Sequence, residues 1–273
     1  MLKDNAYKPY RVMFVIYIFF ICYAFILTPP AEILSGLYKI LISKDVLITD
    51  YVELAGFGGA LVNVSIVGLS CTLIMYFAKI KPSGAIIMAI WLANGFSFFG
   101  KNFYNIWPGM LGVYIYHRVQ RKPFSNFALV FILSSSLAPI VTHSIHIDSG
   151  AGGLSLVVAI LLGILSGIIC GFILPPIAAA TNRVHNGYNL YNVGFASGLI
   201  GTLYLSIAKS FGIVMESNYV WGSASGTESL ILIIGVCIIL FIFGIKEKGC
   251  PVFSDLIKIT KHSGRLVSDY YIL

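Results

Sequence analysis

Two short polar stretches with almost the same sequence interrupt the apolar segments of this chain. Asn-Phe-Tyr-Asn occupies residues 102–105 and Asn-Leu-Tyr-Asn occupies residues 189–192. An amide side chain both donates and accepts hydrogen bonds, so it can satisfy backbone groups freed by a helix break or coordinate a polar solute. The alternative is that these asparagines are helix caps and turn residues at the membrane surface. We favour cavity lining for the first stretch and capping for the second.

Lys101 comes directly before the first stretch and is the only charged residue between two short apolar segments, 84–99 and 106–116. Its ammonium could contact an anionic or dipolar solute, or its flexible side chain could extend to the membrane surface. Both alternatives stay open at this point. The candidate solute-binding residues are Lys101, Asn102, Asn105, Asn189 and Asn192.

The composition is that of a membrane protein. Of the 273 residues, 58% are apolar and 11% are charged, and the mean hydropathy is +0.89. Soluble domains have about 45–50% apolar and about 25% charged residues. The difference excludes a soluble enzyme domain, a disordered tail and a disulfide-stapled secreted module. We therefore expect an all-α fold, a polytopic bundle of transmembrane helices.

The apolar runs that lack Asp, Glu, Lys and Arg predict the membrane spans. They are 13–28, 57–77, 84–99, 106–116, 127–142, 154–174, 190–208 and 229–245. A spanning helix needs about 20 residues, and six of these runs reach or approach that length with their flanks. The runs 84–99 and 106–116 are short, so they predict a re-entrant hairpin or one broken helix.

The positive charges favour the re-entrant alternative. With the N-terminus inside, 14 of the 18 Lys and Arg residues fall inside, three fall outside, and Lys101 lies in the break. Lys and Arg are enriched in cytoplasmic loops, which also accounts for the net charge of +7 without nucleic-acid binding. A single broken crossing would invert every later segment. We expect about six full spans plus one re-entrant pair in the cell membrane, with both termini cytoplasmic.

Residues 1–46 are expected to hold the first transmembrane helix and an outside loop. The basic residues before this helix would also suit a signal peptide. Pro29 and Pro30 follow where a small-residue cleavage site should lie, which favours an uncleaved helix.

The segments 47–54 and 266–273 match at four of eight positions, including Asp50 and Asp269. Five predicted spans separate them, and an odd number of spans inverts the second copy. Inverted repeats are common in transporters, with the pathway at the repeat interface. We therefore expect a membrane domain at 47–264 as the first repeat unit and the truncated start of a second unit at 265–273. A missing second half or a homo-oligomer would complete such a pathway.

Other small and polar residues have structural explanations. Gly163, Gly167 and Gly171 follow one another at four-residue spacing, which lets helices pack closely. Asn63 and Ser65 lie inside an apolar run and are expected to hydrogen bond across helices.

The sequence contains no catalytic or cofactor-binding motif of the G-x-S-x-G, P-loop or G-x-G-x-x-G type. His143, His146 and Asp148 could bind a metal, but they lie in a predicted outside loop without a zinc signature. The five cysteines form no C-x-x-C pair and predict no disulfide. Asp50 and Glu53, at the entrance of a span, are weak candidates for ion coupling. We expect no metal, no cofactor and no enzymatic activity.

Four segments carry a family resemblance: Thr49-Asp50-Tyr51, Gly58-Gly59-Ala60-Leu61-Val62-Asn63, Phe99-Gly100-Lys101-Asn102 and the stretch from Gly187 to Ala196. Together they resemble a family of uncharacterised bacterial membrane proteins, domain of unknown function 1576. The resemblance covers most of the chain from about Asp45 and is most specific from His185 to Ala196. It implies a longer protein with a second related half, of which this chain is an N-terminal portion. It implies no substrate and no catalytic residue.

These observations predict a channel or transporter, or half of one, for a small polar solute. We expect it to lie in the lipid bilayer, and we expect no nucleic-acid partner. The break at 100–105 resembles the half-helices of solute channels such as urea transporters, in architecture only. The alternative is a membrane assembly or interaction protein whose glycines and asparagines serve packing alone. An intramembrane enzyme is the third and weakest alternative.

Overall fold

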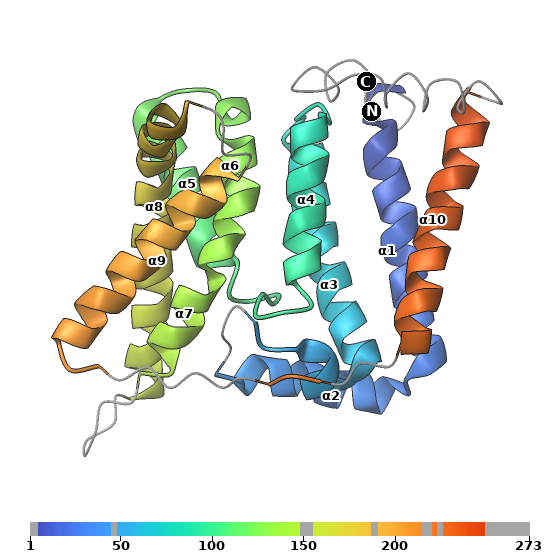
Figure 1. Cartoon of the computed structure of the whole chain (residues 1–273), viewed down its shortest axis with the longest axis horizontal. Coiled ribbons are helices and arrows are strands. Elements are labelled where there is room, and N and C mark those ends of the chain that lie inside the picture. Colours follow the sequence, from blue (N-terminus) through green and yellow to red (C-terminus); the bar gives the residue numbers. More distant parts are fainter. Residues whose placement is uncertain are drawn as a thin grey trace.

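The computed structural model describes residues 5–44, 48–147, 155–186, 191–213, 220–222 and 226–248. Within these ranges the chain is helical and contains no strand, which confirms the predicted all-α class (Figure 1). The α-helices are α1 (Lys8–Leu27), α2 (Pro30–Ile42), α3 (Tyr51–Phe77), α4 (Gly84–Phe96), α5 (Trp107–Gln120), α6 (Ala128–Leu133), α7 (Ala138–Ile145), α8 (Leu156–His185), α9 (Asn192–Ser210) and α10 (Gly226–Lys248). Short 3₁₀ turns are η1 (Asn5–Tyr7), η2 (Phe124–Asn126) and η3 (Ser134–Leu137).

Five described segments are long and apolar enough to cross a membrane: α1, α3, the segment from α6 to α7, α8 and α10. They coincide with five of the six predicted full spans. The sixth predicted span is α9, which has 19 residues but is not among these segments. Hydroxyl side chains such as Ser197, Thr202 and Ser206 recur along α9, and Lys209 lies in its last turn, so polar groups interrupt its apolar surface.

The helices form two groups (Figure 1). The α3 group contains α1, α3, α4 and α10, with α2 across one end. The α8 group contains α5 to α9. α1 and α2 pack on α3, whereas α5, α7 and α9 pack on α8. Contacts between α4 and α6 join the two groups.

α2 is a helix at a place where the sequence predicted an outside loop. Its signals were present in the sequence. Pro30 lies in the first turn, where the N–H that proline lacks would have no helical partner. Glu32 near the N-terminus and Lys39 in the last turn suit the helix dipole. A Cβ at Gly36 would overlap the carbonyl oxygen of Ala55. α2 therefore lies with its backbone directly against the beginning of α3.

The two short apolar segments form the predicted half-helices. α4 begins at one end of the molecule and ends midway, and α5 returns toward the same end (Figure 1). They do not pack together as a tight hairpin, because α4 packs on α3 and α6 while α5 packs on α8. The loop between them consequently runs from the α3 group to the α8 group.

A second break divides the segment that we predicted as one continuous span over 127–142. α6 ends at Leu133, the 3₁₀ turn η3 follows, and α7 begins at Ala138. The hydroxyls of Ser134 and Ser136 donate to carbonyl oxygens of the preceding turn, both at 2.7 Å. Pro139 in the first turn of α7 has no N–H to donate. The chain thus changes helix type at the depth where α4 ends.

The glycines of α8 serve packing within the chain, as their spacing predicts. Gly167 faces Pro108 of α5, and a Cβ at Gly171 would overlap the carbonyl oxygen of Gly109. Gly163 faces Ile145 and Val141 of α7. α8 is consequently the central helix of its group, with α5 and α7 in backbone contact with it.

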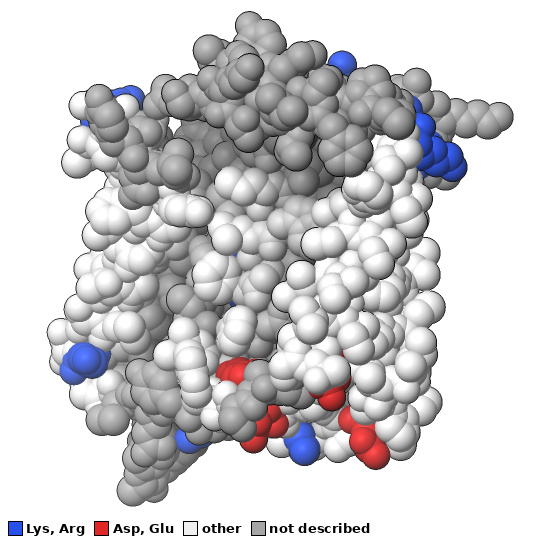
Figure 2. Space-filling view, turned by 45° about the vertical axis from the view of Figure 1, so that its right-hand side comes forward, with Lys and Arg blue, Asp and Glu red and all other residues white. Residues whose placement is uncertain are grey.

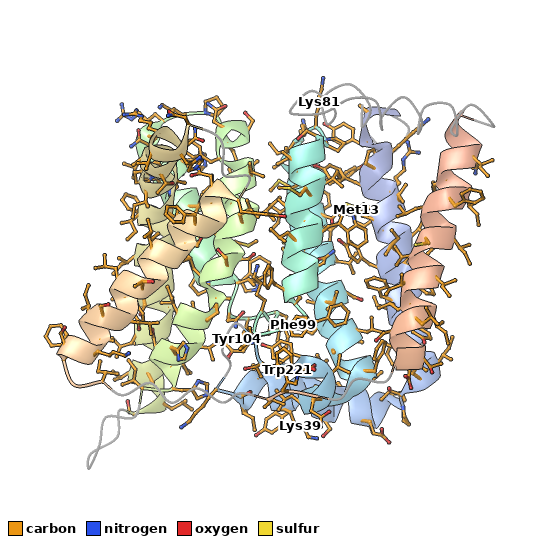
Figure 3. The ribbon with its side chains drawn as sticks, in the orientation of Figure 1. Met13, Lys39, Lys81, Phe99, Tyr104 and Trp221 are labelled. Carbon is orange, nitrogen blue, oxygen red and sulfur yellow. The ribbon has the colours of Figure 1, made fainter. Side chains whose placement is uncertain are left out.

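Charged side chains gather toward the two ends of the molecule, and the middle band is largely uncharged in Figure 2. Lys39 lies at the end that α2 covers and Lys81 at the opposite end (Figure 3). α1 begins and α10 ends on the side of Lys81 (Figure 1). An uncharged band between two charged ends, crossed by apolar helices, is the arrangement of an integral membrane protein.

Candidate functional site

The α4–α5 loop, residues 97–106, is held by two asparagines that cap each other. Asn105 Oδ1 accepts the backbone N–H of Asn102 at 2.9 Å, and Asn102 Oδ1 accepts the backbone N–H of Asn105 at 3.0 Å. Gly100, with φ of 63°, supplies a left-handed turn that other residues rarely adopt. The reciprocal bonds satisfy backbone donors ahead of α5, where a helix offers no partners of its own.

Asn63 of α3 fixes the same loop from the side. It is fully buried, and its Nδ2 donates to the carbonyl oxygens of Ser97 and Lys101 at 2.8 and 2.9 Å. Its Oδ1 accepts the backbone N–H of Phe103 at 3.1 Å. This confirms the structural explanation of Asn63, because all three bonds go to loop backbone that no helix could satisfy.

The loop is tied to both helix groups. Asn102 Nδ2 donates to the hydroxyl of Tyr51 at 3.2 Å, and Asn105 Nδ2 donates to Thr142 Oγ1 of α7 at 3.0 Å. Tyr51 opens α3, where Asp50 Oδ1 caps the helix by accepting the N–H of Val52 at 2.8 Å. Asp50 therefore acts as a helix cap in this structure, and the loop spans the seam between the groups.

Lys101 places its ammonium at the meeting point of the two breaks. The residue is 2% exposed, and Nζ donates to Ser135 Oγ of η3 at 3.1 Å. The ammonium also lies 4.9 Å from the centre of the Phe96 ring, within the range of a cation–π interaction. Among the described residues no carboxylate pairs with it. The side chain is thus buried rather than extended to the surface.

The upper cavity, of about 730 Å³, lies between α4 on one side and α6, α8 and α9 on the other. Lys101 forms its floor, and Asn126 and Asn182 line it near η2 and the end of α8. Most of the remaining wall is apolar: Met88, Leu92, Phe96, Leu129, Val130, Leu133, Pro175 and Val193. A hollow is visible in the middle of the molecule in Figure 2. The cavity has the size and lining of a small-molecule site.

The lower cavity, of about 340 Å³, lies between α7 and α9. Ser136 and Gly194 line both cavities. Ser136 Oγ lies 2.7 Å from Ser197 Oγ, so two hydroxyls are in contact where the cavities meet. His143 contributes a polar group to the lower cavity. The two cavities consequently follow one another along α9.

The predicted solute-binding residues fall in different places. Lys101 and Asn192 line the upper cavity, but Asn192 Nδ2 donates to the carbonyl oxygen of Ala178 at 2.8 Å and its Oδ1 accepts from Thr181. Asn102 and Asn105 are fully buried in the loop and hold its backbone. Asn189 and the second repeat segment, 265–273, lie outside the described residues.

The serines of η3 were not predicted as site residues. Ser135 receives the bond of Lys101, and Ser136 joins the two cavities, yet neither was a candidate. The signal was the run Ser134-Ser135-Ser136 followed by Pro139, which is unusual inside an apolar span and could have indicated a break.

The histidines have a different place from the one we predicted. His143 belongs to α7 and His146 follows the last residue of this helix, so neither lies in an outside loop. The ring nitrogen Nδ1 of His146 lies 2.9 Å from the carbonyl oxygen of Thr142. Among the described residues no group of three or more His, Cys, Asp or Glu is placed to hold a metal ion. Asp148 is outside the described ranges.

The fold and the site define an all-helical integral membrane protein in which two interrupted helices meet inside the bundle. The family DUF1576, described as a protein of unknown function, matches residues 29–210. The match covers more than half of the chain, and the chain belongs to this family. It includes the α4–α5 loop and both cavities. No curated protein and no solved structure matches the chain.

Proposed function

We propose that this protein is a channel or transporter for a small polar solute, and that the solute passes through the upper and lower cavities. One observation carries the proposal: two helix breaks, bonded through Lys101 and Ser135, form the floor of a 730 Å³ cavity. Irregular backbone at membrane depth is tolerated where it is buried in protein or lines an aqueous cavity. Broken helices near the membrane midplane are a recurrent feature of transporter binding sites.

Polar groups along the route support the proposal. Asn126 and Asn182 line the end of the upper cavity, Lys101 its floor, and Ser136 the junction with the lower cavity. Of these groups Lys101 is almost fully buried, and buried polar groups need partners. A solute or water molecule in the cavities would supply hydrogen-bonding partners to these polar side chains.

The charge distribution supports one orientation in the cell membrane. Lys81 precedes α4, Arg121 follows α5 and Arg183 lies in the last turn of α8. These three lie at the end where α1 begins, and Lys39 lies at the opposite end (Figures 1 and 3). Because Lys and Arg are enriched in cytoplasmic loops, the proposal places the upper cavity toward the cytoplasm and the lower cavity toward the outside.

The test is solute flux into vesicles that contain the purified protein. Light scattering would follow swelling in gradients of acetamide, glycerol and potassium lactate, the last with valinomycin to balance charge. The expected result is swelling above that of protein-free vesicles with at least one solute. Ser136→Trp, which would fill the junction of the cavities, is expected to return the rate to that of protein-free vesicles.

The matched control is Ser206→Trp on the same helix as Ser197. Ser206 is exposed, donates only to the carbonyl oxygen of Thr202, and lines neither cavity. It should keep the full flux. Equal flux in Ser136→Trp and wild type would contradict the proposed route. No flux with any of the three solutes, in protein that remains folded, would favour an assembly role instead.

A further inference from the structure

The upper cavity differs from an ordinary polar channel in one respect: its floor is a single buried cation and most of its wall is apolar. Lys101 is 2% exposed, and its hydrogen-bonding partner Ser135 is a neutral hydroxyl. The Phe96 ring and the neutral thiol of Cys71 also lie near it. In the described part of the chain this ammonium has no anionic partner.

A buried charge is costly unless an opposite charge or several hydrogen bonds compensate it. Ser135 and Phe96 compensate it only in part, because each supplies a dipole or quadrupole and no net charge. The missing compensation can come from a ligand, since Lys101 also lines the cavity. One buried positive charge would be balanced by one anionic group on the ligand.

The rest of the cavity indicates what is attached to that anionic group. The walls next to Lys101 come from α4 and α6, through Leu92, Phe96 and Leu133. These side chains offer no hydrogen bond to a hydrated inorganic ion, but they favour an apolar body through burial of surface. The amides of Asn126 and Asn182 lie at the far end, beyond the apolar wall.

We propose that the upper cavity binds an organic monoanion, with its carboxylate on Lys101 and its apolar body between α4 and α6. The inference rests on the proposed function, because it names the solute class for the same cavity. Ser135 is fully buried and bonds the ammonium from behind the cavity wall, so it would hold Lys101 in position. The bond between the ammonium and a carboxylate is charge-assisted, and such bonds are stronger than neutral ones.

The test is equilibrium binding of labelled benzoate to the purified protein at neutral pH, with benzamide as the neutral molecule of the same shape. Benzoate should bind saturably with one site per chain, and benzamide should compete at least about tenfold more weakly, because it lacks the charge. Chloride and phosphate should compete more weakly than benzoate, because neither has an apolar body.

Lys101→Gln should weaken benzoate binding at least about tenfold while leaving benzamide binding nearly unchanged. Lys209→Gln is the control, since Lys209 is an exposed cation at the end of α9 and should not affect either ligand. Leu133→Trp would fill the cavity beside α6 without changing the charge, and it should abolish benzoate binding. This second variant tests the site if Lys101→Gln does not fold.

Three results would overturn the inference: equal affinity for benzoate and benzamide, unchanged benzoate binding in Lys101→Gln, or unchanged binding in Leu133→Trp. The two proposals fail separately. Flux of acetamide or glycerol without benzoate binding would leave the solute pathway in place and exclude the monoanion. Benzoate binding without flux of any solute would support the binding site and contradict transport.

Discussion

The two helix breaks that meet at Lys101 are built in different ways. The α4–α5 loop is held by amide side chains: Asn63, Asn102 and Asn105 together bond backbone groups at Ser97, Gly100, Lys101, Asn102, Phe103, Tyr104 and Asn105. The η3 break uses hydroxyls that donate to their own preceding turn and lies against α5 at Gly109. One break depends on amide side chains, two of its own and one from α3, and the other depends on close packing.

The difference follows from how far the backbone departs from a helix. The α4–α5 loop reverses direction, so several N–H and carbonyl groups lose helical partners and must find others inside the membrane. η3 only tightens the helix for one turn, and most of its bonds remain local. Substitutions should therefore affect the first break through lost hydrogen bonds and the second through steric overlap.

The largest expected effect is that of Asn63→Ala. It removes the partners of two carbonyl groups and one N–H in a fully buried place, and each unsatisfied group costs about 1–3 kcal/mol. We expect the free energy of unfolding in bicelles to fall by about 3–5 kcal/mol, summed with allowance for relaxation. Asn182→Ala, on the exposed surface near the end of α8, is the control. A loss as small as that of the control would show that water replaces the amide.

A smaller effect is expected from Gly109→Ala, which tests the packing of the second break. A Cβ at Gly109 would lie 2.9 Å from the carbonyl oxygen of Ser134, and an overlap of this kind costs about 1–3 kcal/mol. Gly201→Ala has no neighbour within 4 Å and should be neutral or slightly stabilising, because alanine favours a helix. Thermal unfolding of both variants would measure the difference. Equal stability would mean that α5 does not hold η3 in place.

The smallest effect is expected from Ser134→Ala. The serine hydroxyl donates only to the carbonyl oxygen of Phe131 in the same turn, and a local bond of this kind is worth less than about 1 kcal/mol. The same unfolding measurement applies. A loss as large as that of Asn63→Ala would remove the distinction between the two breaks, since both would then depend on polar partners.

The sequence predicted the helical class, five of the described spans and the first break, because these depend on local composition. Lys101, Asn102 and Asn105 are charged or amide residues in an apolar setting, so their position was visible without a structure. The partners of these side chains were not visible, since Asn63 and Tyr51 come from a helix 38 and 51 residues earlier in the chain.

The second break escaped prediction for a physical reason. A serine can satisfy its hydroxyl on the carbonyl of the preceding helical turn, so Ser134 and Ser136 fit an uninterrupted transmembrane helix as well as a broken one. α2 was missed because 13 residues are too few for a span, and only its end residues indicate a helix. Asn192 lines the upper cavity, but the sequence did not show that its amide also attaches α9 to α8.

The most direct test of this account is the access of water-soluble thiol reagents to Ser136→Cys in protein whose native cysteines are replaced. These are Cys22, Cys71, Cys170, Cys237 and Cys250. Because Ser136 lines both cavities and Lys101 bonds its neighbour, an anionic methanethiosulfonate should react faster than a cationic one, and Lys101→Gln should remove that preference. Asn182→Cys should label, and Leu161→Cys on the apolar face of α8 should not. Failure of Ser136→Cys to react with either reagent would contradict a water-filled route through the two breaks.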